Sequence, residues 1–434
     1  MDCTDLICHY LTDGIKSNTK NHVGIELEFP LVNETAPAIE LSVVEPLFEA
    51  VCGIGYHVVR RDRNGVPLKA KDDGGNVFTF DTCFENIEFA MASAPDLIQI
   101  YRRFRQTLKT AQEALKPFRH AIIGVGYNPN IVKTTPHLVE SELTLSIAEY
   151  FREHPVKRRF HKDFYCMVSS EQVHFNTTEE ELPLIFEAFT RLDWLNILLF
   201  SDSPAHIEQK QYLCSRNELY MRSPFAEIGL VGAQKLGLKS VRDIAESYKD
   251  ICIFMRERGG KTELFWPEPV GKYFESPEAL PEDIHQLDLE RNIVTTSYGT
   301  TEYRILCSQP FSDSFVPSAF NLGLRKKLDM TLAIAREFDG SHDMPEPNER
   351  NRQASLGAVA FADKAETAEL MQRLLAVSRQ GLSERGFGEE TFLAPLFARA
   401  HISDNPAIRL LRRERLVGAH AAYMERADAG EDIV

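Results

Sequence analysis

The chain has 434 residues, of which 43% are hydrophobic and 26% are charged, and its formal net charge is −15 at pH 7. These values are typical of a folded globular protein and argue against extended disorder. The negative charge disfavours nucleic acid or an anionic membrane as a general partner, because both would be repelled at long range. No stretch is apolar for long enough to cross a bilayer, and the first residues lack a basic region followed by an apolar run, so we expect a cytoplasmic protein.

The first third of the chain alternates between strands and helices. Amphipathic helices are predicted near residues 41–52 and, with apolar residues at helical spacing, over about 95–118. The segment 62–76 is rich in turn residues and separates two strands. The predicted strands are VGIELEFPL, YHVVRR, NVFTFDT, ENIEFAMA and HAIIGVGYNPN, at residues 23–31, 56–61, 76–82, 85–92 and 120–130.

The middle of the chain repeats this alternation, and the last part is helical. Strands are predicted at 163–176 and 300–311, and helices at 179–200, near 240–256, and in the segments 318–338, 364–380 and 391–400. The charged segment GSHDMPEPNERN, residues 340–351, is predicted to be a linker. It separates an α+β region, residues 1–339, from a helical C-terminal region, residues 352–434, which we expect to pack on the first.

Two carboxylates stand side by side on the first predicted strand. Glu26 and Glu28 are two residues apart, so their side chains point to one face while Leu27 points to the other. One such pair alone is better explained by a strand face in contact with water than by a metal site. Three further strands offer a polar face of the same kind, and the residues on these faces are Glu88; Gln172, His174 and Asn176; and Glu302 and Arg304.

Four carboxylates gathered on one sheet face would repel one another unless cations neutralise them. Glu26, Glu28, Glu88 and Glu302 therefore form a candidate metal site. Oxygen ligands suit Mg²⁺ or Mn²⁺, and Mg²⁺ commonly bridges to nucleotide phosphates. The eight cysteines are scattered without a CxxC pair, which disfavours zinc and iron–sulfur sites. His174 could serve as a ligand, but a hydrogen-bonding role fits it better.

Two arginines are candidates for binding anionic groups. Arg304 fits a clamp on a transferring phosphoryl group, because guanidinium binds phosphate through two hydrogen bonds. The alternative is a simple salt bridge between Arg304 and Glu302 along the same strand. Arg216 is a second candidate for binding phosphate or a substrate carboxylate, although most loop arginines are merely solvated.

In this order along the chain, these motifs resemble the glutamate–cysteine ligase family in its bacterial and plant-type branch, within the wider glutamine synthetase superfamily. The family's opening strand, a Gly followed by Glu-x-Glu, is matched by Gly24, Glu26 and Glu28, and its late Glu-x-Arg strand by Glu302 and Arg304. Between them lie counterparts of its Gly-Gly-Gln-hydrophobic-Glu element, its Gln-Val-Asn or His-Val-His strand, its Asn-Ser-Pro loop and its Ser-Arg segment, at 85–90, 172–176, 201–204 and 215–216. Asn86 in place of Gln, Glu85 in place of Gly and Tyr220 in place of Trp depart from the family pattern and put the acceptor pocket in doubt.

The resemblance implies an α+β fold built on a largely antiparallel β-sheet cradle, flanked by helices and followed by a helical C-terminal region. It implies an ATP-dependent ligase that activates a carboxylate, by resemblance the γ-carboxylate of glutamate, as an acyl phosphate and joins it to cysteine or another amine. Arg304 and Arg216 would then act in catalysis. Gln172, His174 and Asn176 would line the donor or nucleotide pocket.

Three other interpretations stay open at this point. A phosphotransferase acting on a nitrogen acceptor would use the same superfamily fold without a second amine. A catalytically silent relative would bind a nucleotide or a protein partner. A purely structural α+β protein would leave its strand carboxylates in water, but it would not explain why the motifs keep the family's order. The sequence carries no pattern that sets an oligomeric state.

Overall fold

The computed structural model describes residues 2–17, 22–153, 163–287, 290–399 and 404–430. A nine-stranded sheet lies at the centre of these residues. Its strands are β1 (Val23–Asn33), β2 (Tyr56–Arg61), β3 (Pro67–Asp72), β4 (Val77–Phe80), β5 (Asn86–Ala94), β6 (His120–Ile122), β7 (Ser170–Asn176), β14 (Ile293–Thr295) and β15 (Thr300–Cys307). Eight of them follow the order β14-β15-β7-β1-β5-β4-β3-β2, β6 pairs with β1, and every pairing in the sheet is antiparallel.

Helices and short hairpins surround this sheet. The helices are α1 (Cys3–Ser17), α2 (Val44–Cys52), α3 (Leu97–Leu115), α4 (Glu142–Glu153), α5 (Phe164–Met167), α6 (Leu182–Phe200), α7 (Ser215–Met221), α8 (Pro224–Glu227), α9 (Val241–Tyr248), α10 (Val270–Tyr273), α11 (Val316–Lys326), α12 (Leu328–Ser341), α13 (Pro347–Ser355), α14 (Lys364–Arg385), α15 (Ala394–Ala398), α16 (Pro406–Val417) and α17 (Ala419–Met424). The remaining strands are β8 (Ala205–Ile207), β9 (Lys210–Tyr212), β10 (Val231–Gly232), β11 (Cys252–Arg258), β12 (Lys261–Pro269) and β13 (Glu290–Arg291). None of the described helices combines the length and the apolar character that a bilayer crossing requires.

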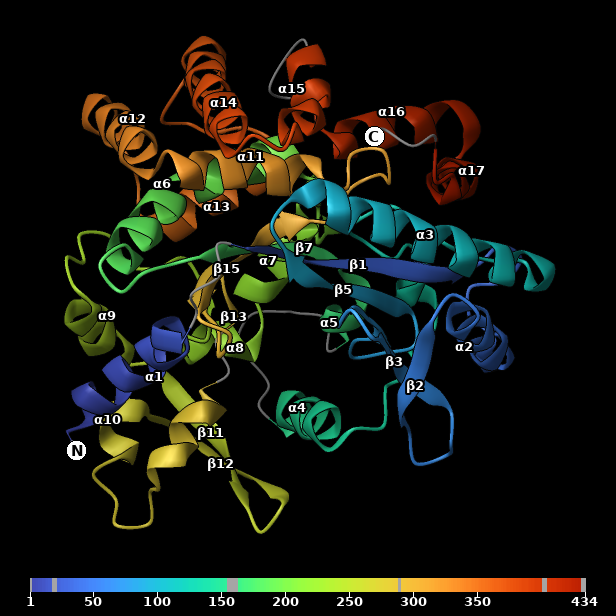
Figure 1. Ribbon diagram of the computed structural model, residues 1–434, viewed down its shortest axis with the longest axis horizontal. Coiled ribbons are helices and arrows are strands. Elements are labelled where there is room, and N and C mark those ends of the chain that lie inside the picture. The colour runs from blue at the N-terminus through green and yellow to red at the C-terminus, as the bar shows by residue number, and fades with distance from the viewer. Residues whose placement is uncertain (1, 18–21, 154–162, 288–289, 400–403, 431–434) are drawn as a thin grey trace.

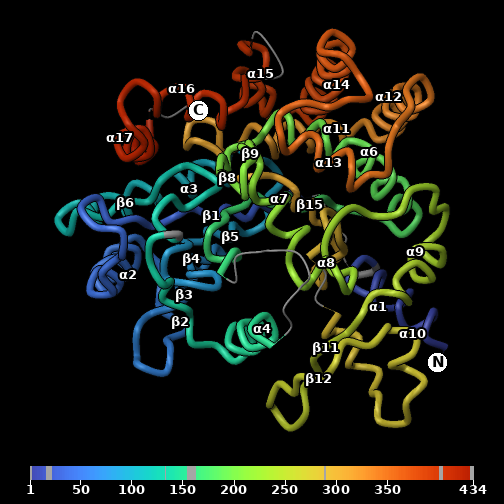
Figure 2. Tube along the Cα trace, turned by 180° about the vertical axis from the view of Figure 1, so that it is seen from behind, coloured from blue at the N-terminus to red at the C-terminus, as the bar shows by residue number. Residues whose placement is uncertain are grey.

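The two faces of the central sheet differ in what covers them. Figures 1 and 2 show α3, α6 and α11 with the C-terminal helices on one side, and α4, α5 and α8 on the other. On the first side, Phe29 of β1 stacks on Phe104 of α3, and Phe175 of β7 stacks on Phe189 of α6. We call this side the helix-covered face. The glutamates of β1 alternate with its buried apolar residues and point to the opposite side, the open face.

The predicted fold class is confirmed: the chain is α+β, with a largely antiparallel sheet and a helical C-terminal part. Two details of the prediction were wrong. The turn-rich segment 62–76 contains strand β3, which pairs with β2 and β4. The helix expected over 240–256 ends at Tyr248, because the following apolar run forms β11 and pairs with β12 through a turn at Gly259 and Gly260, both with positive φ.

Three further segments differ from the prediction. The strand expected over 120–130 ends at Ile122, and the backbone nitrogens of Gly124 and Gly126 donate instead to Arg426 and Asp202. The predicted strand over 163–176 begins as the short helix α5 and extends only from Ser170. The predicted linker at 340–351 contains the start of α13, which packs against α6. The division of the chain into two regions stays a prediction.

Candidate functional site

A cavity of about 180 Å³ lies on the open face, between the central strands and α4, α5, α7 and α8. Strand pairing brings the polar side chains of this face together, because directly paired residues point to the same side of a sheet. The pairs are Glu28 with Glu88, Glu26 with Gln172, and His174 with Glu302. Four neighbouring strands thus place all four predicted metal ligands on one face.

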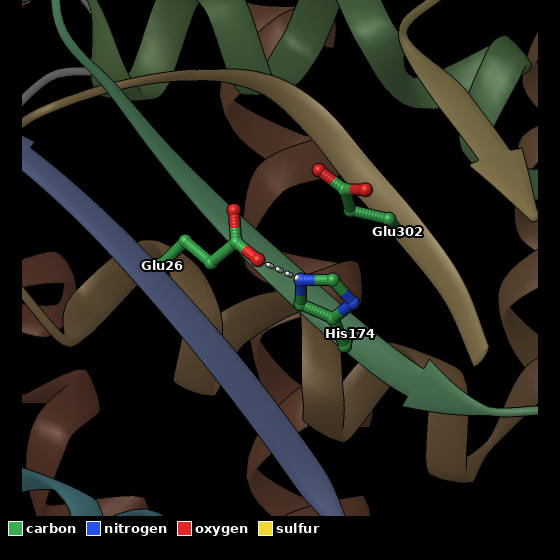
Figure 3. Close-up of side chains that lie close together, drawn as sticks. All are labelled: Glu26, His174 and Glu302. Carbon is green, nitrogen blue, oxygen red and sulfur yellow. Dashed lines mark ion pairs between the residues drawn. The ribbon is translucent and has the colours of Figure 1, made fainter. Parts of the chain in front are cut away.

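The first group of candidate ligands consists of Glu26, His174 and Glu302 (Figure 3). One donor atom from each lies within 4.8 Å of the other two. His174 Nε2 is 3.2 Å from Glu26 Oε1, and Nδ1 is 3.2 Å from the hydroxyl oxygen of Thr300. Each ring nitrogen of His174 therefore has a polar neighbour, which fits the predicted hydrogen-bonding role. One of these nitrogens also lies close enough to both carboxylates for His174 to be a candidate metal ligand.

Burial and charge act in opposite directions on this group. Burial raises the pKa of Glu302, and Glu26 adds to that rise, while Arg304 and His174 oppose it. Burial also disfavours the charged forms of Glu26 and His174. The contact between the two side chains outweighs this effect, so the pKa of Glu26 is lowered and the pKa of His174 is raised. The contact therefore favours the carboxylate form of Glu26 and the imidazolium form of His174.

The second group consists of Glu28, Glu88 and Asp81. The carboxylate of Glu28 accepts hydrogen bonds of 2.9 Å from the backbone nitrogen and hydroxyl of Ser170 and from the side-chain amide of Gln172. Glu88 has no hydrogen-bond partner among the described residues. Burial, followed by the charges of Glu26, Asp81 and Glu28, raises its pKa well above the usual range. Burial, with Glu28 and Glu290, raises the pKa of Asp81 to about 7. Burial is the largest cause of both shifts, and repulsion among the carboxylates adds to it; a bound cation would relieve that repulsion.

The two predicted arginines both line the cavity, but their surroundings differ. Arg304 forms ion pairs of 2.5 Å with Glu302 and 2.8 Å with Glu290. The structure therefore contains the salt bridge to Glu302 that the sequence offered as the alternative to a phosphoryl clamp. Arg216, in the first turn of α7, is 7% exposed. Its guanidinium lies 5.1 Å from the ring centroid of Tyr220 and forms no ion pair or hydrogen bond with a described residue.

Two site residues were missed in the sequence. Asp81 lies near the end of the predicted strand NVFTFDT and directly after β4 in the structure, where an acidic residue ordinarily means only a turn. Glu290 lies in the two-residue strand β13, whose position depends on pairing with β10 and has no local pattern. Of the three residues predicted to line a pocket, Gln172 lines this cavity, whereas His174 and Asn176 are not among its lining residues. Asn176 instead accepts a hydrogen bond from Arg325 through its backbone oxygen.

Comparisons with known proteins agree with this geometry. No protein-family model and no curated protein sequence matches the chain. Among solved structures, glutamate–cysteine ligase from Francisella tularensis in complex with AMP matches with a TM-score of 0.55 and 12% identity, over 95% of this chain and 90% of that one. A bifunctional glutathione synthetase from Pasteurella multocida matches with a TM-score of 0.53 and 15% identity, over 98% of this chain and 52% of that one, so this chain spans about half its length. The chain has the carboxylate–amine ligase fold, and the resemblance inferred from the strand motifs is confirmed at the level of the fold.

Proposed function

We propose that the chain is an ATP-dependent ligase that uses Mg²⁺ or Mn²⁺ to join a carboxylate to an amine. The observation that carries this proposal is one cavity on the open face that holds carboxylates from β1 and β5 beside two arginines. The chain that contains this cavity has a fold similar to that of a glutamate–cysteine ligase whose structure was solved in complex with AMP. An acidic surface of this kind would repel nucleotide phosphates unless cations lay between them.

The acidic residues of the open face would hold two divalent cations. Glu26, His174 and Glu302 would hold one, since their donor atoms already lie within 4.8 Å of one another. Glu28, Glu88 and Asp81 would hold the other, and the raised pKa values of Glu88 and Asp81 show how unfavourable their charges are without one. A set of carboxylate oxygens with a single imidazole suits Mg²⁺ or Mn²⁺. Bound cations would neutralise charge on the nucleotide phosphates.

The reaction we infer has two steps, because a carboxylate is too poor an electrophile to react with an amine directly. A carboxylate oxygen of the donor first attacks the γ-phosphorus of ATP, and the bond to ADP breaks, leaving an acyl phosphate. The amine then attacks the acyl carbon, and phosphate leaves as the amide forms. By family resemblance, the donor is the γ-carboxylate of glutamate.

Residues of the open face have separate roles in this scheme. Arg304 is held at the cavity wall by Glu302 and Glu290, and it would stabilise the negative charge on the phosphoryl group during transfer. Gln172 fixes the carboxylate of Glu28 and presents the rest of its amide to the donor or nucleotide. Arg216 would bind an anionic substrate group. Asn176 stays a predicted contributor, at the edge of the site.

The test is a reaction screen on the purified chain. It is mixed with ATP, Mg²⁺, a panel of carboxylate donors that includes glutamate, and a panel of amines, while ADP and phosphate are measured and product masses recorded. We expect ADP release that requires both a donor and an amine, with a product whose mass is that of the amide. A phosphorylated nitrogen compound as product, or no ADP release with any pair, would overturn the proposal.

A further inference from the structure

The cavity has a second end that is apolar and distinct from the cluster of carboxylates. Phe151 of α4, Phe164 of α5 and Phe225 of α8 line it together with Ile147 and Val168. The Phe151 ring centroid lies 4.8 Å from that of Phe225 and 5.5 Å from that of Phe164. The three phenylalanine side chains are at most 6% exposed. Burying a polar group against such a wall without hydrogen bonds is costly, so this end selects for an apolar group.

Arg216 lies where the apolar end meets the charged end. Its guanidinium lies over Tyr220, and the Tyr220 ring is in edge contact with Phe164 at 5.0 Å. The two cavity arginines differ in one respect. Arg304 is already paired with two carboxylates, whereas Arg216 pairs with none among the described residues. A buried guanidinium without an anion binds a carboxylate strongly, through two parallel hydrogen bonds.

We propose that the amine acceptor is an α-amino acid with a large apolar or aromatic side chain. Its carboxylate pairs with Arg216, its side chain packs against Phe151, Phe164 and Phe225, and its amino group faces the charged end. This inference rests on the proposed ligase function and specifies its acceptor. In the second step the carbon–nitrogen bond forms, the bond from carbon to the phosphate oxygen breaks, and the released phosphate takes up the proton that the amine loses.

The adenine ring of ATP is the other flat group that would fit an aromatic wall. Adenine carries no negative charge with which Arg216 could pair. An apolar α-amino acid uses both the cation and the wall. The two occupants are separated by asking which Michaelis constant changes when the wall is altered.

The first experiment separates this inference from the proposed function. Hydroxylamine traps an acyl phosphate as a hydroxamate and needs no side-chain pocket. With the full chain, ATP, Mg²⁺ and the donor panel, hydroxamate formation reports the ligase chemistry alone. Phenylalanine, tyrosine, leucine, cysteine, alanine and serine are then compared as acceptors. We expect kcat/KM for phenylalanine to exceed that for alanine by more than about 100-fold, because several buried methylene equivalents separate them.

Each outcome of this screen has a defined meaning. Hydroxamate formation together with a preference for cysteine, alanine or serine overturns the acceptor proposal and leaves the ligase function standing. Failure to form hydroxamate with any donor overturns both. Phenethylamine, which lacks the carboxylate of phenylalanine, serves as a matched probe of Arg216. We expect it to react at least about 100-fold less efficiently than phenylalanine, since it leaves the guanidinium without an anion.

Variants locate the two contacts. In Arg216→Met, the advantage of phenylalanine over phenethylamine should shrink about 10-fold or more, because the charge that rewards the carboxylate is gone. In Phe225→Ala, the preference for phenylalanine over alanine should fall by about the same factor. If Phe225→Ala does not fold, the milder Phe225→Leu provides the measurement. If these variants raise KM for ATP but leave unchanged the preference for phenylalanine over phenethylamine and over alanine, the proposal is overturned in favour of adenine.

Discussion

The two faces of the central sheet both contain buried carboxyl groups, yet only one of them forms a site. On the helix-covered face, Glu171 of β7 is fully buried and accepts hydrogen bonds from the backbone nitrogen and hydroxyl of Ser318 at 3.0 and 2.5 Å. Its burial raises its pKa well above the usual range, which favours the neutral acid. Glu88 on the open face is also held above its usual pKa, but it faces three other carboxyl groups and has no donor among the described residues.

This difference shows that burial of a carboxyl group does not by itself indicate function. Among the described residues, no charged group affects the ionisation of Glu171, and one of its carboxyl oxygens accepts the hydrogen bonds from Ser318. The open face instead places Glu26, Glu28 and Asp81 around Glu88, where a bound cation would relieve the repulsion. The distinguishing property is therefore like charges gathered at one cavity, and the predictions below test it from the largest expected effect to the smallest.

The strongest test compares Glu88→Gln with Glu171→Gln. We expect the first to lower ligase activity by more than about 100-fold, since altering even an outer partner of a metal ligand costs 10- to 100-fold. The second replaces a neutral acid with a neutral amide of the same shape and should retain activity. The measurement is the rate of ADP release, with thermal unfolding to confirm that both variants fold. Equal loss in the two variants would remove the distinction between the faces.

A second test concerns Arg304, the cation of the open face that is already paired. Arg304→Met should lower kcat by about 10²- to 10³-fold, because it removes charge stabilisation that the transferring phosphoryl group needs. Arg304→Lys should give an intermediate rate, since lysine keeps the charge but loses the two-pronged geometry. Steady-state kinetics with saturating ATP measure this effect. A loss confined to KM, with kcat unchanged, would assign Arg304 to ground-state binding alone.

Metal binding gives a third test that needs no substrate. Chelator-treated protein should unfold at a temperature about 3 °C or more higher after Mg²⁺ or Mn²⁺ is added well above its dissociation constant, because a ligand that binds only the folded state stabilises it. In Glu88→Gln this gain should shrink, and in Glu171→Gln it should persist. Thermal unfolding followed by circular dichroism is the measurement. A gain that is the same in all three proteins would place the metal elsewhere.

The smallest effect concerns pH and the helix-covered face. Asp193 of α6 accepts hydrogen bonds from Asn292 and Tyr303, and burial raises its pKa to about 7 from an ordinary value of 3.8. Between these values the folded protein binds more protons than the unfolded chain, so stability contributed by Asp193 is lost as pH rises through that window. Asp193→Asn should be less stable overall but should lose less stability between pH 5 and pH 8. Urea unfolding at the two pH values measures this, and an unchanged pH dependence would contradict it.

Much of the open face was predictable because its signal is local. Residues two apart on a strand share a face, so Glu26 with Glu28, and Glu302 with Arg304, could be placed on one side before any pairing was known. The resemblance then supplied the order of the strands' motifs. The confirmed α+β class follows from the same alternation, since period-two segments and amphipathic helices are both readable in a short window.

What was missed depends on pairing between distant segments. Asp81 and Glu290 reach the cavity only through the β4–β5 bend and the parallel pairing of β13 with β10. The apolar end of the cavity is built from α4, α5 and α8, whose phenylalanines look in the sequence like ordinary core residues. Strand β3 was hidden by the Gly, Asp and Lys residues around it, which favour turns unless neighbouring strands provide hydrogen-bond partners on both edges.

The central claim is that the open face activates a carboxylate by phosphorylating it. The most direct measurement uses a donor whose carboxylate oxygens are ¹⁸O, starting with glutamate labelled at the γ-carboxylate, together with ATP, Mg²⁺ and an accepted amine. Each amide bond formed through an acyl phosphate transfers one labelled oxygen to the released phosphate, so mass spectrometry should find one ¹⁸O in phosphate per amide made. Amide formation with unlabelled phosphate would contradict the account.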